Sequence, residues 1–198
     1  MNKNQLDDYL HSTEFINWQH PAVVTKAQEL AQEACSEIEI AKASFEWVRD
    51  EIKHSYDFGI QTVTCKASDV LAAKTGYCYA KSHLLAALLR ANSIPAGLCY
   101  QRLSLDNNGI QHCLHGLNAI FLPDYGWYRV DSRGNKTGVN AQFTPPVEQL
   151  AFPIQMKGEA NLPEIWADPL PVVINVLQSY KTSDEVNQHL PDIQLVSM

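Results

Sequence analysis

The first third of the chain has the hydrophobic spacing of amphipathic helices. Residues 21–34 begin with a proline, which suits the first turn of a helix, and then repeat apolar side chains at helical intervals. Ser36 followed three residues later by Glu39 fits a capping box, and an apolar stripe continues behind it to about Lys53. We therefore expect two helices before the break at Gly59.

The most apolar segment of the chain predicts a central helix. It runs from Cys78 to Ala91, and its apolar side chains cover nearly every side of a helix. A shorter helix is expected just before it, starting at Ser68 and Asp69. Pro95 comes soon after the long helix, so we expect the chain to have left the helix by then.

The middle of the chain has the pattern of antiparallel strands. Residues 96–105 are apolar and aromatic and run into a strong turn signal at residues 106–109. Residues 113–122 and 127–131 are predicted to be the two arms of a hairpin around a turn that contains proline and glycine. Together with the helices, these strands predict an α+β fold.

The register of this hairpin decides which side chains share a face of the sheet. If the chain turns about residue 124, Phe121 pairs with Trp127 and Leu117 pairs with Asp131. His115 then lies diagonal to Asp131 on the same face, within reach of it. A slip of one residue would place the two side chains on opposite faces.

The last third of the chain predicts irregular structure and two more helices. A proline-rich stretch over residues 143–153 is expected to lie over the core, followed by a helix over residues 170–180 and a short one capped by Thr182 or Ser183. With no internal repeat and no long linker, we expect a single domain over residues 1–198. It would comprise a helical part (1–44), a core (45–135) and an extension packed on that core (136–198).

Composition narrows the function classes. The formal net charge is −7 and no cluster of Lys and Arg is present, which argues against a nucleic-acid partner. The apolar runs are too short to cross a bilayer, and the first eight residues lack a signal-like apolar stretch. Five cysteines are an odd number, which favours free thiols in a reducing compartment. We therefore expect a cytoplasmic protein without a membrane partner; its oligomeric state stays open.

Cys78 is the strongest candidate for a reactive residue. It stands where the central helix begins, and the positive end of a helix favours the nucleophilic thiolate form of a cysteine. Gly76 leaves room for a substrate to approach. The alternative is a small buried hydrophobe, which is the usual place of a free cysteine. On spacing alone the two interpretations are evenly balanced, whereas a structural role is favoured for the other four cysteines.

His115 and Asp131 complete a possible nucleophilic site. A thiol, an imidazole and a carboxylate are the groups that acyl transfer through a thioester requires. Taken alone, His115 fits a hydrogen-bonded core histidine and Asp131 a carboxylate that caps a loop. Together with Cys78 they favour a catalytic triad.

A metal site is the competing use of the same side chains. His112, Cys113 and His115 lie close in sequence, with His83 or Cys78 as further ligands. Neighbouring strand residues point to opposite faces, however, and zinc requires four ligands in a tetrahedron. We therefore expect neither a metal nor another cofactor. Lys81, one turn into the central helix, is expected to be solvated or paired with an acid rather than catalytic.

The order of these motifs resembles the transglutaminase-like superfamily of papain-like cysteine enzymes. The resemblance covers residues 45–135: Gly76-x-Cys78 with its apolar helix, His115 and the hairpin after it, and Val130-Asp131. It implies an α+β papain-like fold in which the nucleophile helix packs centrally on an antiparallel β-sheet. It also implies that Cys78 is the nucleophile, His115 the general base and acid, and Asp131 the residue that orients His115.

The resemblance has departures that bear on the substrate groove. Many members carry an acidic residue where this chain has Tyr77, an aromatic residue soon after the histidine where it has residues 116–118, and a proline where it has Ser132. The backbone N–H of Cys78 is the first expected donor to an oxyanion. Gln61 and Tyr56 are candidates for the second donor, and Tyr77 is a further candidate for a contact in the groove.

The function expected from the sequence is acyl transfer from an amide bond. The substrate would be a peptide, a protein or a small amide, and the thioester would pass to water in a protease or deamidase, or to an amine in a transamidase. We favour hydrolysis slightly. Two alternatives remain: a non-catalytic binding module with the same fold, and an enzyme similar to the arylamine acetyltransferases.

Overall fold

The computed structural model describes residues 6–106 and 108–193. Residues 1–5 at the amino terminus and Asn107 of the expected turn lie outside the described residues. The elements in chain order are η2 (Asp7–Tyr9), α1 (Pro21–Ala31), α2 (Glu37–Glu51), β1 (Lys53–His54), α3 (Ala67–Ala73), β2 (Thr75–Gly76), α4 (Cys78–Ala91), β3 (Ala96–Ser104), β4 (His112–Leu122), β5 (Gly126–Val130), β6 (Ala160–Asn161), α5 (Pro171–Ser179) and α6 (Ser183–Gln188).

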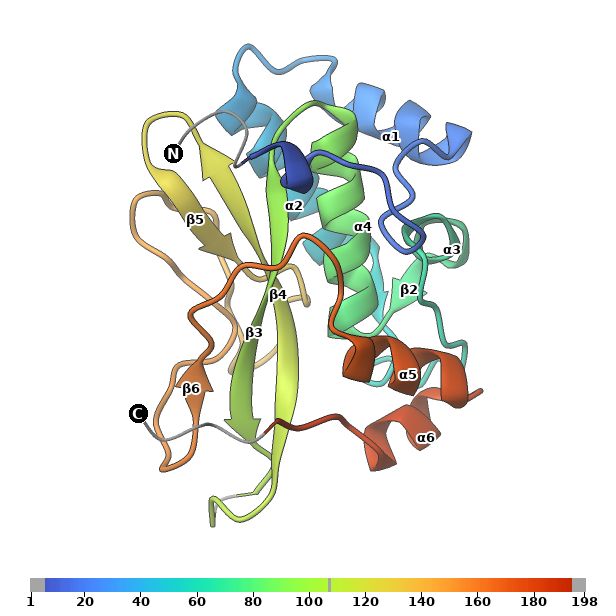
Figure 1. The fold of residues 1–198 in the computed structure, drawn as a ribbon, viewed down its shortest axis with the longest axis vertical. Helices are drawn as coiled ribbons and strands as arrows, with labels where there is room; N and C mark the ends of the chain where they lie inside the picture. The colour runs from blue at the N-terminus through green and yellow to red at the C-terminus, as the bar shows by residue number, and fades with distance from the viewer. Residues whose placement is uncertain (1–5, 107, 194–198) are drawn as a thin grey trace.

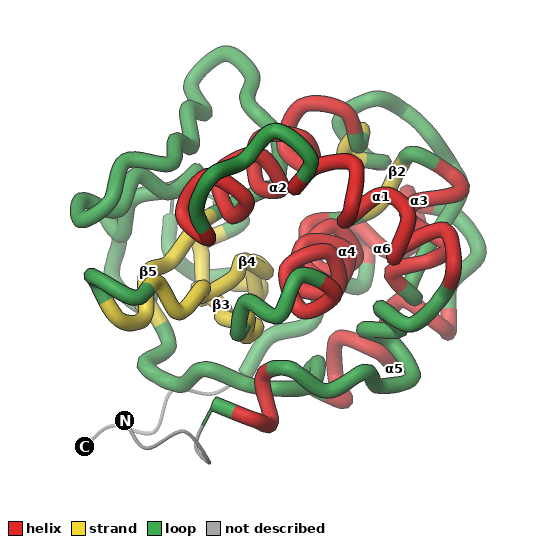
Figure 2. The backbone as a smooth tube through the Cα atoms, turned by 90° about the horizontal axis from the view of Figure 1, so that it is seen from above, coloured by secondary structure: helices red, strands yellow, loops and turns green. Residues whose placement is uncertain are grey.

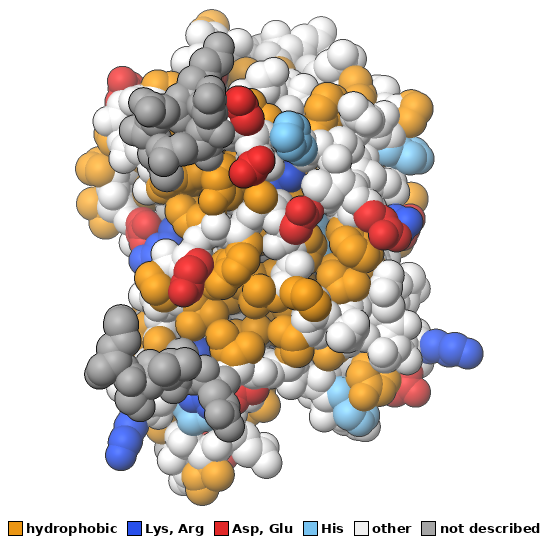
Figure 3. All heavy atoms as spheres, viewed as in Figure 1, with side chains coloured by type: hydrophobic (Ala, Val, Ile, Leu, Met, Phe, Trp, Pro, Cys, Tyr) orange, Lys and Arg blue, Asp and Glu red, His pale blue; other side chains and the backbone are white. Residues whose placement is uncertain are grey.

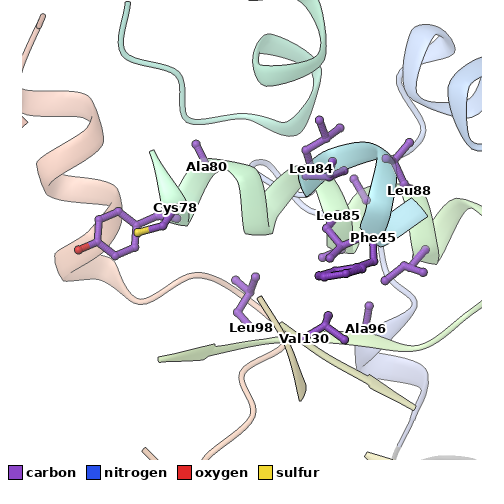
Figure 4. Close-up of a cluster of buried hydrophobic side chains, with 14 of the residues drawn as sticks. Phe45, Cys78, Ala80, Leu84, Leu85, Leu88, Ala96, Leu98 and Val130 are labelled. Carbon is purple, nitrogen blue, oxygen red and sulfur yellow. The ribbon is translucent and has the colours of Figure 1, made fainter. Parts of the chain in front are cut away.

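Helix α4 lies at the centre of the molecule. Figure 2 shows it end-on, with the sheet on one side and the other helices around the rest. Every residue from Cys78 to Arg90 is buried, and its leucines face side chains of α2, β3 and β5 (Figure 4). Each fully buried leucine stabilises the fold by about 1.5–3 kcal/mol relative to an exposed one. The central helix predicted from the apolar pattern is confirmed.

Polar side chains hold α4 in place at its far end and along its length. The guanidinium of Arg90 donates to the carbonyls of Ala96 (2.8 Å), His11 (2.8 Å) and Ala167 (2.6 Å). The amide of Asn118 on β4 donates to the carbonyl of Ser82 at 2.9 Å. Helix and sheet are therefore fixed to each other by directional contacts as well as by apolar packing.

The main sheet has the strand order β5-β4-β3-β6, and the pairs are antiparallel. Phe121 pairs with Trp127 and Asn118 with Val130, which confirms the predicted register. Asp131 follows the last paired residue of β5 directly. This register brings Asp131 to the face of β4 that carries His115.

A second, very short sheet lies just before α4 and was not predicted. Lys53 and His54 of β1 pair in parallel with Thr75 and Gly76 of β2. The ladder is continued by the N–H of Ser55, which donates to the carbonyl of Gly76 at 3.1 Å. Strands of two residues are too short to show an alternation of apolar and polar side chains, so the sequence pattern could not predict this pairing. It places His54 beside the segment that leads into Cys78.

The last third of the chain covers one end of α4. Figure 1 shows α5 and α6 beside the end of α4 at which Cys78 lies. The N–H of Ser183 in α6 donates to the carbonyl of Gln61, and the N–H of Leu114 in β4 donates to the carbonyl of Pro191 at 2.7 Å. Pro191 therefore lies beside the strand that carries His115.

Lys81 corrects one expectation. It has no exposed surface, and its ammonium group donates to the carbonyls of Ile52 and Arg49 at the end of α2. Burial lowers its pKa from 10.5 to about 7, and the nearby Arg133 acts in the same direction. Lys81 is thus an internal link between α2 and α4 rather than a solvated surface residue.

The surface is mixed. On the face seen in Figure 3, hydrophobic side chains gather across the middle, with charged side chains scattered around and above them. Among the described residues no helix is both long and apolar enough to cross a membrane.

Candidate active site

Cys78 is the first residue of α4 and lies in the wall of a cleft. The residue is 5% exposed, and the N–H of Gly116 lies 3.5 Å from its sulfur in donor geometry. As the first helical residue, Cys78 has an N–H group with no carbonyl partner in its own helix. The partial positive charge of the helix end acts on the same region. The sulfur and the backbone N–H group of Cys78 therefore lie at the same wall of the cleft, where a carbonyl group of a substrate could bind to both.

His115 and Asp131 are in direct contact, as the register predicted. His115 Nε2 donates to Asp131 Oδ2 at 2.7 Å, and both side chains are buried. Asp131 also accepts from the N–H of Arg133 at 3.1 Å and the N–H of Ala151 at 3.1 Å. A carboxylate with this many fixed donors is held in one orientation. It fixes the orientation of the imidazole, whose other side interacts with Cys78.

Charges in this pair favour a protonated histidine. Burial alone would lower the pKa of His115, but the charge of Asp131 and the interaction with Cys78 outweigh it and raise the pKa to about 10. Burial raises the pKa of Asp131, but the charge and hydrogen bond of His115 together with the N–H groups of Arg133 and Ala151 bring it below its ordinary value. The pair therefore holds opposite charges at neutral pH. An imidazolium next to Cys78 can stabilise a thiolate.

Gly116 explains how strand and helix come so close. A Cβ at this position would lie 2.9 Å from Tyr79 Cδ1 and 3.1 Å from Tyr79 Cα. Any side chain would therefore push β4 away from the first turn of α4. Gly116 belongs to the residues 116–118 that follow His115 where many members of the resembled family have an aromatic residue, and here it allows His115 and Cys78 to approach each other.

The cleft has a volume of about 480 Å³ and contains Cys78 and His115 in its wall. One part of its lining is apolar, which suits the side chain of a peptide or a hydrophobic acyl group. The rest is polar and of mixed charge. The apolar residues of the lining include Leu103, Leu105, Leu114, Phe152, Met156 and Leu190, and the polar ones include His54, Asp57, Arg133, Lys136, Glu159 and Asn187.

Three of these residues were missed by sequence reasoning. The ring of Phe152 packs edge-on against His115, with 5.1 Å between the centroids. Arg133 lies over the same phenyl ring and pairs with Asp57 at 2.7 Å. His54 contributes from β1, with its ring 4.8 Å from that of Tyr77. All three come from segments without a periodic hydrophobic pattern, so the sequence carried no signal that they line the cleft. Phe152 belongs to the proline-rich stretch, Arg133 to the loop after β5, and His54 to the two-residue strand β1.

The structure treats the three candidates for groove contacts differently. Tyr56 and Tyr77 line the cleft, and Tyr77 donates its hydroxyl hydrogen bond to Asn187 Oδ1 at 2.9 Å. Gln61 is exposed and lies outside the cleft lining. Its carbonyl accepts a hydrogen bond from the N–H of Ser183 at the start of α6. The structure therefore does not place Gln61 in the lining of the cleft.

The other cysteines have surroundings unlike those of Cys78. Burial raises the pKa of Cys65, Cys99 and Cys113 each to about 12, which disfavours their thiolates. Cys35 is exposed. Within residues 6–106 and 108–193 no group of three His, Cys, Asp or Glu side chains is arranged to hold a metal ion.

Comparisons with known proteins agree with this geometry. The family model of the transglutaminase-like superfamily matches residues 24–132, a span that includes Cys78, His115 and Asp131. No curated protein matches the chain significantly.

Two solved structures share the fold at low sequence identity. A candidate cysteine protease from Cytophaga hutchinsonii is 17% identical with a TM-score of 0.54, and the match covers 67% of this chain and 43% of that one. The periplasmic domain of TgpA from Pseudomonas aeruginosa is 19% identical with a TM-score of 0.51, covering 67% of this chain and 48% of that one. This chain therefore spans less than half the length of either protein. Because the family match extends over more than half of its residues, the chain belongs to the transglutaminase-like superfamily.

Proposed function

We propose that this protein is a cysteine-dependent enzyme that cleaves an amide bond through a thioester on Cys78. The observation that carries the proposal is the arrangement of His115, which contacts Asp131 at 2.7 Å and the Cys78 thiol within one cleft. The Cytophaga hutchinsonii neighbour is described as a candidate cysteine protease, and that is the same class of reaction. At 17% identity, the likeness itself supports the fold only.

The chemistry follows from the order of the three groups. A thiolate at Cys78, stabilised by the His115 imidazolium, attacks the carbonyl carbon, and the carbonyl electron pair moves to oxygen. When the tetrahedral intermediate collapses, the C–N bond breaks and His115 gives its proton to the leaving amine. Water, with its proton taken by His115, then hydrolyses the thioester. Asp131 keeps the imidazole in the productive orientation throughout.

Selective alkylation tests whether Cys78 is a reactive nucleophile. Brief treatment with iodoacetamide at about pH 6 should give a single adduct at Cys78, because ordinary thiols are mostly protonated there. Cys35 serves as an internal control, since it is exposed and lies outside the site. Intact mass and peptide mapping give the position. Equal slow labelling of Cys35 and Cys78 would favour a binding module that retains the fold.

Amide cleavage itself is tested with a library. Peptides and glutamine amides are incubated with the protein, and new amines, ammonia release and incorporation of an added amine are measured together. Hydrolysis without amine incorporation supports a peptidase or deamidase. Turnover must disappear in Cys78→Ser; turnover that survives this change contradicts the proposal.

A further inference from the structure

The site described so far has only one donor for the negative oxygen that forms during the reaction. The N–H of Cys78 can serve as the first, but an oxyanion is usually held by at least two preorganised donors. Of the sequence candidates, Gln61 lies outside the cleft and the Tyr77 hydroxyl already binds Asn187. Tyr56 is 44% exposed, so water competes for its hydroxyl.

We propose that the Nε2–H group of His54 is the second donor to this oxyanion. The inference rests on the proposed acyl-transfer function and assigns a further catalytic residue to it. His54 lines the same cleft as Cys78 and His115, and it is 4% exposed.

The short β1–β2 sheet fixes the position of His54 relative to the nucleophile. His54 stands opposite Gly76, two residues before Cys78. The flanking hydrogen bonds, from Lys53 N–H to the Lys74 carbonyl and from Ser55 N–H to the Gly76 carbonyl, measure 3.0 and 3.1 Å. Backbone pairing on both sides of His54 fixes its backbone, and the ring packs against that of Tyr77 at 4.8 Å between the centroids. A donor of this kind is preorganised, which is what oxyanion stabilisation requires.

The hydrogen bonds of the ring select the tautomer. The N–H of Asp57 donates to His54 Nδ1 at 3.4 Å, whereas the Asp57 carboxylate lies 3.7 Å from the same nitrogen, beyond hydrogen-bond distance, so Nδ1 accepts and the proton of the neutral ring resides on Nε2. Between described residues no hydrogen bond uses Nε2. Burial and the nearby Arg133 also lower the pKa of His54, which keeps the ring neutral at physiological pH. A neutral imidazole can donate a hydrogen bond without giving up its proton.

The role is therefore electrostatic and leaves the proton balance of the reaction unchanged. As the Cys78 sulfur bonds to the carbonyl carbon, the oxygen gains the electron pair and accepts hydrogen bonds from Cys78 N–H and His54 Nε2–H. When the intermediate collapses, the pair returns to re-form the carbonyl group. The proton for the leaving group comes from His115, and His54 keeps its own.

Two substitutions at His54 separate the donor from the space that the ring fills. His54→Gln places an amide N–H near the position of Nε2, whereas His54→Asn places its amide near Nδ1 and has no donor at the Nε2 position. The probe is p-nitrophenyl acetate, which acylates a reactive cysteine whatever the natural substrate is. Single-turnover release of nitrophenolate and the acetyl adduct on Cys78 are measured.

The expected result is a hundredfold to thousandfold slower acylation in His54→Asn, since this is the typical cost of losing one donor. His54→Gln should stay within about tenfold of wild type, as one donor remains in place. Iodoacetamide alkylation of Cys78 is the control readout. It displaces iodide and forms no oxyanion, so both variants should alkylate at the wild-type rate.

The outcomes distinguish this inference from the function on which it rests. Wild-type acylation with an equal rate in His54→Asn overturns the role of His54 and leaves the proposed function standing. Slow acylation with equally slow alkylation also overturns the role of His54, because the substitution has then lowered the reactivity of the Cys78 thiol itself rather than removed an oxyanion donor. Alkylation of wild type without any acylation overturns the proposed function, and the inference with it.

Discussion

Two histidines line the same cleft and have opposite charge preferences. His115 comes from the main sheet and His54 from the short β1–β2 sheet, and both are 4% exposed. Yet the pKa of His115 is raised and that of His54 is lowered. Burial lowers both, so burial does not explain the difference. The neighbouring carboxylates do.

Each histidine has one aspartate next to it, but the two aspartates differ in their other partners. The charge of Asp57 is already neutralised by cations, whereas that of Asp131 is not. Asp131 receives hydrogen bonds from backbone N–H groups besides that of His115. Asp57 lies 3.7 Å from His54 and is paired with Arg133 and Lys136, whose ammonium nitrogen is 2.8 Å away. Burial and the charge of Arg133, with a smaller effect of Lys81, outweigh the Asp57 carboxylate, so the pKa of His54 falls to about 3 and the ring stays neutral. Because their pKa values are shifted in opposite directions, His115 is suited to carry a proton and His54 to donate a hydrogen bond without losing its proton.

Removal of the proton carrier should have the largest effect. His115→Ala is expected to lower amide turnover by up to about 10⁶-fold, because the general base and acid is lost together with the stabilisation of the thiolate. Alkylation of Cys78 at about pH 6 should slow as well. This is measured by kcat/KM and by intact mass. A loss no greater than that in His54→Asn would contradict the division of roles.

Removal of the charge that raises the His115 pKa should come second. Asp131→Asn keeps the shape of the side chain but removes its charge, and the expected loss of kcat is about 10⁴-fold. The matched control is Asp57→Asn, which acts on the carboxylate beside His54 and should cost less than about tenfold because cations already neutralise it. Equal losses in the two variants would show that the carboxylates do not differ as described.

Displacement of His115 without a change in its chemistry should have an intermediate effect. In Gly116→Ala the new methyl group meets Tyr79 at 2.9 Å, so β4 must shift, and a displacement of about 1 Å can cost about a hundredfold in rate. Stability should fall by about 1–3 kcal/mol.

A matched control for this variant lies outside the cleft lining. In Gly97→Ala the methyl group meets Ile165 at 2.3 Å. This variant should lose stability in urea unfolding and retain the alkylation rate of Cys78. If Cys78 is alkylated at the wild-type rate in Gly116→Ala as well, the close approach of β4 and α4 does not determine the reactivity of Cys78.

The pH dependence of stability should show the smallest effect, with opposite signs for the two histidines. His115, with a raised pKa, contributes stability that is fully present below 6.5 and is lost as pH rises toward about 10. His54, with a lowered pKa, binds a proton more readily in the unfolded chain, so stability is lost as pH falls below 6.5.

Urea unfolding of wild type, His115→Ala and His54→Asn across pH measures this difference. The gap between wild type and His115→Ala should narrow in alkali, and the gap to His54→Asn should narrow in acid, each by roughly 1–2 kcal/mol. Parallel curves for the three proteins would remove the basis of the comparison.

Most of the fold could be predicted from the sequence, because its main elements have strong periodic patterns. The bounds of α4 and the register of the β4–β5 hairpin were both predicted, and the register gave the contact between His115 and Asp131. The other side of the cleft could not be predicted. His54 depends on a two-residue pairing, and Phe152 on irregular chain that packs only in the folded state. Lys81 was expected to be solvated or paired because a lysine is almost never fully buried, even in a helix that is apolar on nearly every side.

The burial of almost all of α4 has one consequence for experiment. A helix enclosed in this way cannot tilt or slide unless the leucine core loosens, and Arg90 holds its other end through three carbonyl groups. The sulfur of Cys78 therefore reports on the packing around α4 itself. Its alkylation rate should respond to substitutions of the α4 leucines but not to a destabilising change on β3 such as Gly97→Ala, and delayed labelling of the buried Cys99 should time the opening of the molecule.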